Sequence, residues 1–176
     1  MKITEPGGHL DQMLRQSRAH HVQLSAMADA KANMLMTLSA LLVTLSAPHV
    51  FKPDFTWPFL VLIAFCLVTV ALAAYAVMPK NPPWQSDDAP PDVNDVKFNL
   101  LFFGDFIRLD YAQYEAAMES MMNDPSRAYE AQVRELYVLG NFLARKKYRY
   151  LRLAYLFFLT GLFASFLTML VLAMIP

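Results

Sequence analysis

Long uncharged stretches alternate with polar segments along the chain. The stretches cover residues 32–47, 58–78 and 153–176. A bilayer core about 30 Å thick needs about 20 apolar residues in a helix, because each residue adds about 1.5 Å. The second and third stretches meet this length, and the first approaches it when it is extended to Val50. The pattern predicts an all-α membrane protein with transmembrane helices at 32–50, 58–78 and 153–175.

The first two spans are separated by a short turn, which favours a helical hairpin. The turn covers residues 51–57 and is expected on the periplasmic side. A buried hairpin in a soluble protein is the alternative for these two stretches. A proline-rich stretch at 79–92 follows the second span and predicts an extended cytosolic linker, since proline cannot donate a backbone hydrogen bond.

The polar segments themselves show helical spacing, which predicts a small cytosolic helical bundle. Residues 1–31 are expected to form an amphipathic cytosolic helix that runs into the first span. Residues 93–152 are expected to be a cytosolic helical segment, with a first helix over 93–109. Asp110 is placed to cap a helix through Met122, and Asp124 with Pro125 is placed to start a helix of about fifty residues that continues into the third span.

Lysine and arginine are distributed unevenly, and this predicts the orientation. Four of them lie before the first span, one in the hairpin turn, and ten between Lys80 and Arg152. Because cytoplasmic loops of membrane proteins are enriched in these residues, the N-terminus and the central segment are expected in the cytoplasm. The C-terminus is then periplasmic. The N-terminus lacks the order of a cleaved signal peptide, so the first span is expected to be retained.

The composition agrees with a membrane protein, since 56% of residues are hydrophobic and 17% are charged. Fifteen Lys and Arg balance fifteen Asp and Glu, so no basic excess indicates nucleic-acid binding. Cys66 is the single cysteine, which excludes a disulfide bond within the chain.

The sequence shows no pattern typical of an enzyme or a metal site. His20 and His21 are adjacent, so on a helix they point about 100° apart and do not share one ion. No nucleophile elbow and no glycine-rich phosphate loop are visible. We therefore expect no catalytic residue, no metal and no cofactor.

Five cations gather between Arg145 and Arg152, at the entry to the third span. They are expected to anchor the span at the lipid headgroups, and an anion site is the functional alternative. Asp29 precedes the first span at the same depth and needs a cationic partner beside lipid. Lys147, Arg149 and Arg152 are the candidates, and Asp29 with Arg152 is the structural ion pair that we assign. Gly161 and Ser165 form a small-residue pair that favours close helix packing.

Three blocks of the sequence carry a family resemblance. They are residues 28–42 (ADAKANMLMTLSALL), 101–106 (LFFGDF) and 136–155 (LYVLGNFLARKKYRYLRLAY). In this order they resemble the transmembrane effectors of the Pycsar antiphage system, and the resemblance covers nearly the whole chain after residue 20.

The resemblance implies an antiphage effector of the bacterial inner membrane. In that system a partner pyrimidine cyclase makes cyclic CMP or cyclic UMP, and the effector senses the nucleotide and impairs the membrane, which causes abortive infection. The chain lacks a recognisable cyclic-nucleotide-binding β-barrel, so a pocket built from helices is expected. The ligand-binding residues that we assign as a hypothesis are Lys31, Phe103, Lys147, Tyr148 and Arg149. The cations would face the phosphate and an aromatic ring would stack on the base.

The hypothesis includes assembly, because three apolar spans cannot line a water path in a monomer. We therefore expect a homo-oligomer on activation. The alternative function is a constitutive membrane scaffold or assembly subunit that holds a protein partner through the helical bundle.

Overall fold

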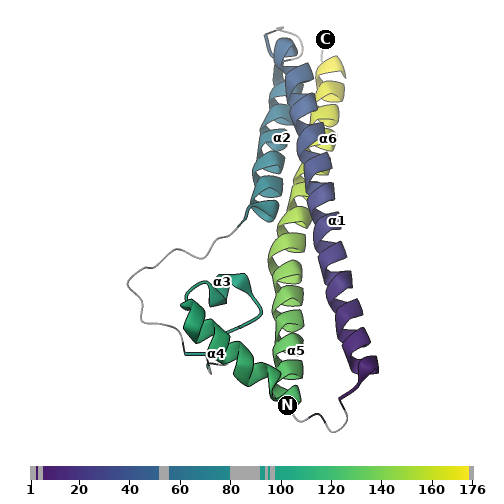
Figure 1. Ribbon diagram of the computed structural model, residues 1–176. Helices are drawn as coiled ribbons and strands as arrows, with labels where there is room; N and C mark the ends of the chain where they lie inside the picture. The colour runs from purple at the N-terminus through teal and green to yellow at the C-terminus, as the bar shows by residue number, and fades with distance from the viewer. Residues whose placement is uncertain are drawn as a thin grey trace. The chain divides into compact units, whose positions relative to one another are not determined.

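The computed structural model describes residues 3, 6–51, 56–79, 92–93, 95 and 98–174. These residues form helices and connecting turns without a strand, and three helical stretches are long and apolar enough to cross a membrane (Figure 1). The predicted all-α fold with three spans is thereby confirmed. The chain divides into two compact units, residues 1–23 with 79–142 (unit 1) and residues 24–78 with 143–176 (unit 2). The predicted linker lies almost entirely outside the described residues.

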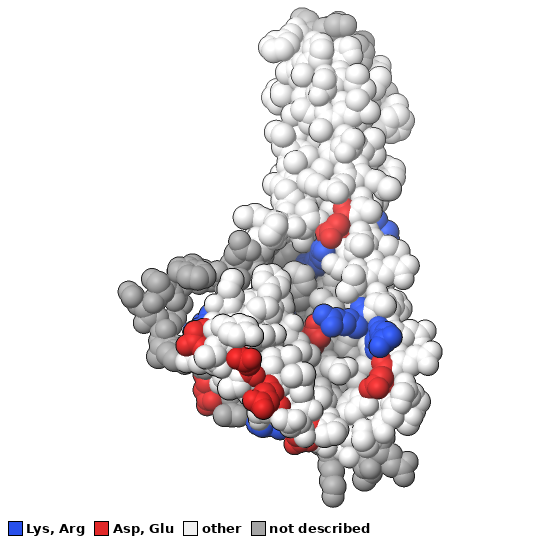
Figure 2. Space-filling view, viewed as in Figure 1, with Lys and Arg blue, Asp and Glu red and all other residues white. Residues whose placement is uncertain are grey.

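Unit 2 contains the apolar helices. Helix α1 (Gly8–Ser46) enters it at residue 24, and α2 (Thr56–Val77) and α6 (Tyr148–Met174) lie beside it (Figure 1). The face of this bundle that is visible in Figure 2 carries no charged side chain over most of its length. Its core holds alanines from all three helices, among them Ala32, Ala73 and Ala154, each fully buried. Small side chains let helix backbones approach closely, which is how apolar helices associate in lipid.

Helices α2 and α6 approach each other closely at Gly161. A Cβ atom added to this glycine would lie 3.0 Å from Cγ of Phe65 and closer still to its Cβ. One turn further on, the Ser165 hydroxyl donates to the carbonyl oxygen of Pro58 at 2.9 Å. The small-residue pair predicted from the sequence therefore packs against α2 of the same chain.

Unit 1 contains the first part of α1 together with α3 (Phe103–Phe106), α4 (Tyr111–Met122) and α5 (Pro125–Phe142). The predicted caps are confirmed. Asp110 accepts from the backbone N–H of Gln113 at 2.7 Å in a capping box, and Asp124 accepts from the backbone N–H of Ser126 at 2.9 Å. From Pro125 the chain is helical to Met174, as predicted, and a π-helical turn at Leu143–Lys147 joins α5 to α6.

The prediction of one helix over residues 93–109 is wrong. Among the described residues of this segment, helix occurs in α3 alone. Two side chains take the backbone donors that a helix would use: Asp105 accepts from the N–H of Asn99 at 2.9 Å, and Asn99 accepts from the N–H of Leu101 at 3.1 Å. Short polar side chains compete with the helix in this way.

Candidate functional site

A buried lysine occupies the end of the π-helical turn. The side chain of Lys147 is 9% exposed, and its ammonium group lies 2.7 and 2.8 Å from the two carboxylate oxygens of Asp29. It also donates to the hydroxyl of Ser25 at 2.7 Å. Two of its donors make hydrogen bonds, to Oδ2 of Asp29 and to Ser25, and Oδ1 of Asp29 lies within ion-pair distance. The arrangement holds α1 against the turn.

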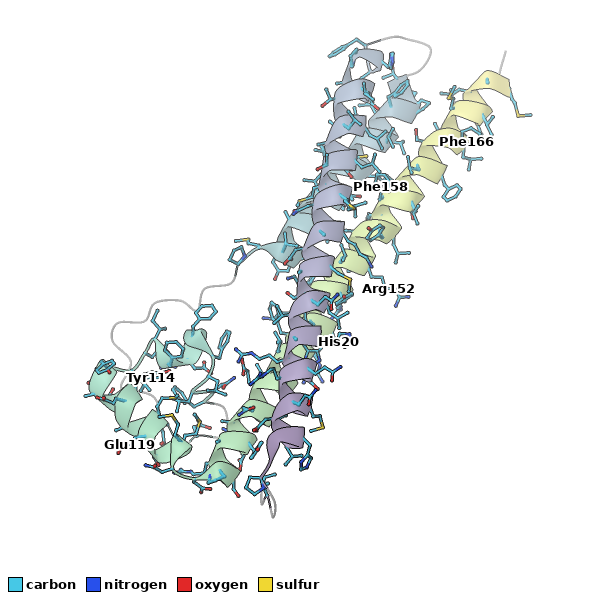
Figure 3. All side chains as sticks on the ribbon, turned by 45° about the vertical axis from the view of Figure 1, so that its right-hand side comes forward. His20, Tyr114, Glu119, Arg152, Phe158 and Phe166 are labelled. Carbon is cyan, nitrogen blue, oxygen red and sulfur yellow. The ribbon has the colours of Figure 1, made fainter. Side chains whose placement is uncertain are left out.

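The assignment of Arg152 as the partner of Asp29 is therefore corrected, because Lys147 fills that role. Arg152 lies five residues further along, which on a helix turns its side chain by about 140°. Its side chain is exposed and points away from the bundle (Figure 3).

The five residues assigned to ligand binding fall in both units. In unit 2, Lys31 and Arg149 are exposed, Lys147 is held by Asp29, and the Tyr148 hydroxyl donates to the carbonyl oxygen of Leu24 at 3.1 Å. Phe103 lies in unit 1 on α3. Nucleotide binding by these residues stays a prediction, and the contacts of Lys147 and Tyr148 give both a role in holding α1.

Unit 1 contains a cavity of ≈ 540 Å³, which we name the α4–α5 cavity. Its wall combines small and apolar side chains with amides, two arginines and one glutamate. The lining residues are Val93, Phe98, Asn99, Leu100, Gln113, Ala116, Ala117, Ser120, Met121, Arg127, Glu130, Ala131 and Arg134. Its volume lies within the range of small-molecule sites, which span about 300–1,000 Å³.

The two arginines of the α4–α5 cavity are oriented by neighbouring groups. Arg134 donates to the carbonyl oxygens of Phe98 at 3.2 Å and Asp95 at 3.4 Å, and it pairs with Glu130 at 3.2 Å. Arg127 donates to the hydroxyl of Ser120 at 2.8 Å, which links α5 to α4. Two guanidinium groups and one carboxylate leave the wall with a net positive charge.

Asn99 is the most buried polar side chain of this wall, with 3% of its surface exposed. Its Oδ1 accepts from Leu101, which fixes the orientation of the amide. Its Nδ2 has no hydrogen-bond partner within the described part of the chain. Neither Asn99 nor Arg134 was predicted from the sequence, where the position of the polar Asn99 at the edge of an apolar run is the one signal for it.

A second cavity of unit 1, of ≈ 360 Å³, lies where α1 meets α5. Arg18 of α1 pairs with Glu135 of α5 at 3.0 Å. The Tyr129 hydroxyl donates to Asp11 at 2.6 Å, and this hydrogen bond, with burial and the charge of Asp11, raises the pKa of Tyr129. These charges have partners across the two helices, so the contact holds α1 and α5 together.

The two adjacent histidines of α1, His20 and His21, lie in different surroundings. His20 is exposed (Figure 3), and the His21 ring lies next to Gly140 of α5. Among the described residues, no group of three His, Cys, Asp or Glu side chains is placed to hold a metal ion.

A comparison with known protein families matches residues 12–175 to the Pycsar effector protein domain. No curated protein and no solved structure matches the chain. The family match spans both units and all three apolar helices.

Proposed function

We propose, since this chain belongs to the Pycsar effector protein family, that it senses a cyclic pyrimidine mononucleotide and then impairs the bacterial inner membrane. The nucleotide, cyclic CMP or cyclic UMP, would come from a partner pyrimidine cyclase activated by phage infection. The resulting death of the infected cell stops phage spread. The observation that carries the proposal is the family match over residues 12–175 of a chain with three membrane-length helices.

The proposed topology places unit 1 and the N-terminus in the cytoplasm and the C-terminus in the periplasm. The uneven distribution of lysine and arginine supports it, because cytoplasmic segments are enriched in these residues. A cytoplasmic unit 1 has direct access to a nucleotide made inside the cell.

The proposed action is a change of helix arrangement and not catalysis. A ligand shifts a conformational equilibrium only by its different affinity for the two states. The helical stretch Pro125–Met174 supports such a coupling, since it begins in unit 1 and ends in the membrane segment. The three spans of one chain carry no charge in their interior, so we propose that several chains assemble when the membrane is impaired.

Binding calorimetry on the purified full-length protein tests the sensing step. The protein is titrated in detergent with cyclic CMP, cyclic UMP, cyclic AMP and cyclic GMP. We expect saturable binding of a pyrimidine nucleotide and no comparable binding of the purine nucleotides. A protein that binds none of the four is no sensor of these nucleotides, and a constitutive membrane scaffold with a protein partner becomes the better account.

A further inference from the structure

We propose that the α4–α5 cavity is where the cyclic nucleotide binds, with the Nδ2 of Asn99 donating a hydrogen bond to it. The proposal rests on the function proposed above. It places the ligand in unit 1 and does not use the cations at the entry to the third span.

The charge of the cavity suits an anion. A cyclic mononucleotide carries one negative charge on its phosphodiester. The wall contains two positive side chains, Arg127 and Arg134, and one negative side chain, Glu130. A guanidinium group has five N–H donors, and the contacts of Arg134 with Asp95, Phe98 and Glu130 engage three of them. Its remaining donors suit phosphate oxygens, which arginine binds in a fork geometry.

The rest of the wall suits a flat ring that carries hydrogen-bond acceptors. Phe98, Leu100 and Met121 supply apolar surface, and alanines of α4 and α5 leave room for a ring. Cytosine and uracil both carry a carbonyl oxygen at ring position 2. A donor amide in the wall therefore recognises either base.

Asn99 supplies that donor. Its Oδ1 is occupied by the N–H of Leu101, while its Nδ2 has no partner within the described residues. A buried donor without an acceptor is unfavourable, and an acceptor on a ligand removes the penalty. The Nδ2 is shielded from solvent, so the wall at residues 98–100 must move for the hydrogen bond to form. The ligand-bound arrangement then differs from the free one, as a sensor requires.

Arg134 connects this wall to the long helix. It lies on α5, and it donates to the carbonyl oxygens of Asp95 and of Phe98. Phe98 directly precedes Asn99 in the chain. A displacement of residues 98–100 therefore acts directly on α5, which is the start of the helical stretch that ends at Met174.

Two pairs of matched variants test the site in the full-length protein. Asn99→Asp keeps the oxygen that accepts from Leu101 and removes the spare donor, whereas Asn141→Asp makes the same change on α5 outside the cavity. Ala116→Trp fills the cavity from α4, and Ala112→Trp adds the same ring to α4 outside the lining. The tryptophan pair leaves Asn99 intact, so the test does not depend on one variant folding.

The measurement is calorimetric titration of each variant with cyclic CMP and cyclic UMP. We expect Asn99→Asp and Ala116→Trp to raise the dissociation constant by about tenfold or more. The dissociation constants of both controls should stay within about twofold of the wild-type value. Wild-type affinity in both cavity variants overturns the site and leaves the proposed function intact. A wild-type protein that binds neither nucleotide overturns both proposals.

Discussion

Asp29 of α1 and Lys147 of the π-helical turn form an ion pair across 118 residues of sequence, with N–O distances of 2.7 and 2.8 Å. The lysine is buried and the side chain of Asp29 is 43% exposed. A π-helical turn is rare and often marks a functional position. Here it brings a cation onto the face of the helix that meets α1, and so joins two helices that both continue into membrane spans.

Removal of either partner is expected to destabilise the bundle. Removal of both is expected to destabilise it by less than the sum of the two single effects. Asp29→Asn leaves a buried ammonium group without a counterion. We expect a coupling energy of about 1–2 kcal/mol for Asp29→Asn with Lys147→Met, smaller than for a fully buried pair because Asp29 is partly solvated. Thermal unfolding in detergent measures it. Lys31→Met, at an exposed site on the same helix, serves as the control, and additive effects of the pair would show that the contact contributes nothing.

The same substitution at two glycines is expected to act with opposite sign. Gly161→Ala places a methyl group against Phe65 and should destabilise the packing of α2 on α6 by about 1–3 kcal/mol. Gly140→Ala meets its nearest atom, on His21, at 3.6 Å, and should stabilise α5 by about 0.5–1 kcal/mol. Melting temperatures of the two variants provide the comparison. Equal tolerance at both positions is incompatible with a close approach at Gly161.

The contact of Tyr129 with Asp11 is expected to make stability depend on alkaline pH. The hydrogen bond needs a protonated tyrosine, so folding raises the pKa of Tyr129 above its ordinary value of 10.0. Its stabilisation is complete below that value and is lost as pH rises through the raised pKa of the folded state. Tyr129→Phe should melt below the wild type at pH 8, and the difference should disappear in strong alkali. Tyr137→Phe, exposed on the same helix, should show no such dependence; a pH-independent deficit for Tyr129→Phe would contradict the assignment.

The topology is tested by thiol labelling in a Cys66→Ala background. Phe51→Cys and Glu119→Cys each add one exposed thiol, the first in the turn after α1 and the second on α4 (Figure 3). A maleimide that cannot cross membranes should label position 51 in spheroplasts and position 119 only after the cells are opened. The reverse pattern would invert the proposed orientation.

The helices were largely predictable because their signals are local. Length and lack of charge identified the three spans, and the short side chains of Asp110 and Asp124 identified the starts of α4 and α5. The segment 93–109 was mispredicted because apolar content favours a helix, while Asn99 and Asp105 bind backbone donors across several residues. Such side-chain contacts have no periodicity to detect.

The candidate site was less predictable, because it depends on which side chains meet. The sequence placed Asp29 near three cations but did not select Lys147, since the choice depends on the local winding of the π-helical turn. The α4–α5 cavity combines Asn99 with residues of α4 and α5 that lie 14 to 35 residues further along the chain. Only the folded arrangement of unit 1 brings these side chains together.

The central claim is that a pyrimidine cyclic nucleotide switches this chain from a harmless membrane protein to one that breaches the bilayer. Its most direct test is dye release from sealed lipid vesicles that contain the purified full-length protein. We expect release when cyclic CMP or cyclic UMP is added on the side that unit 1 faces, and none with cyclic AMP, cyclic GMP or buffer. Vesicles that stay sealed with every nucleotide, or that leak equally without one, would contradict the account.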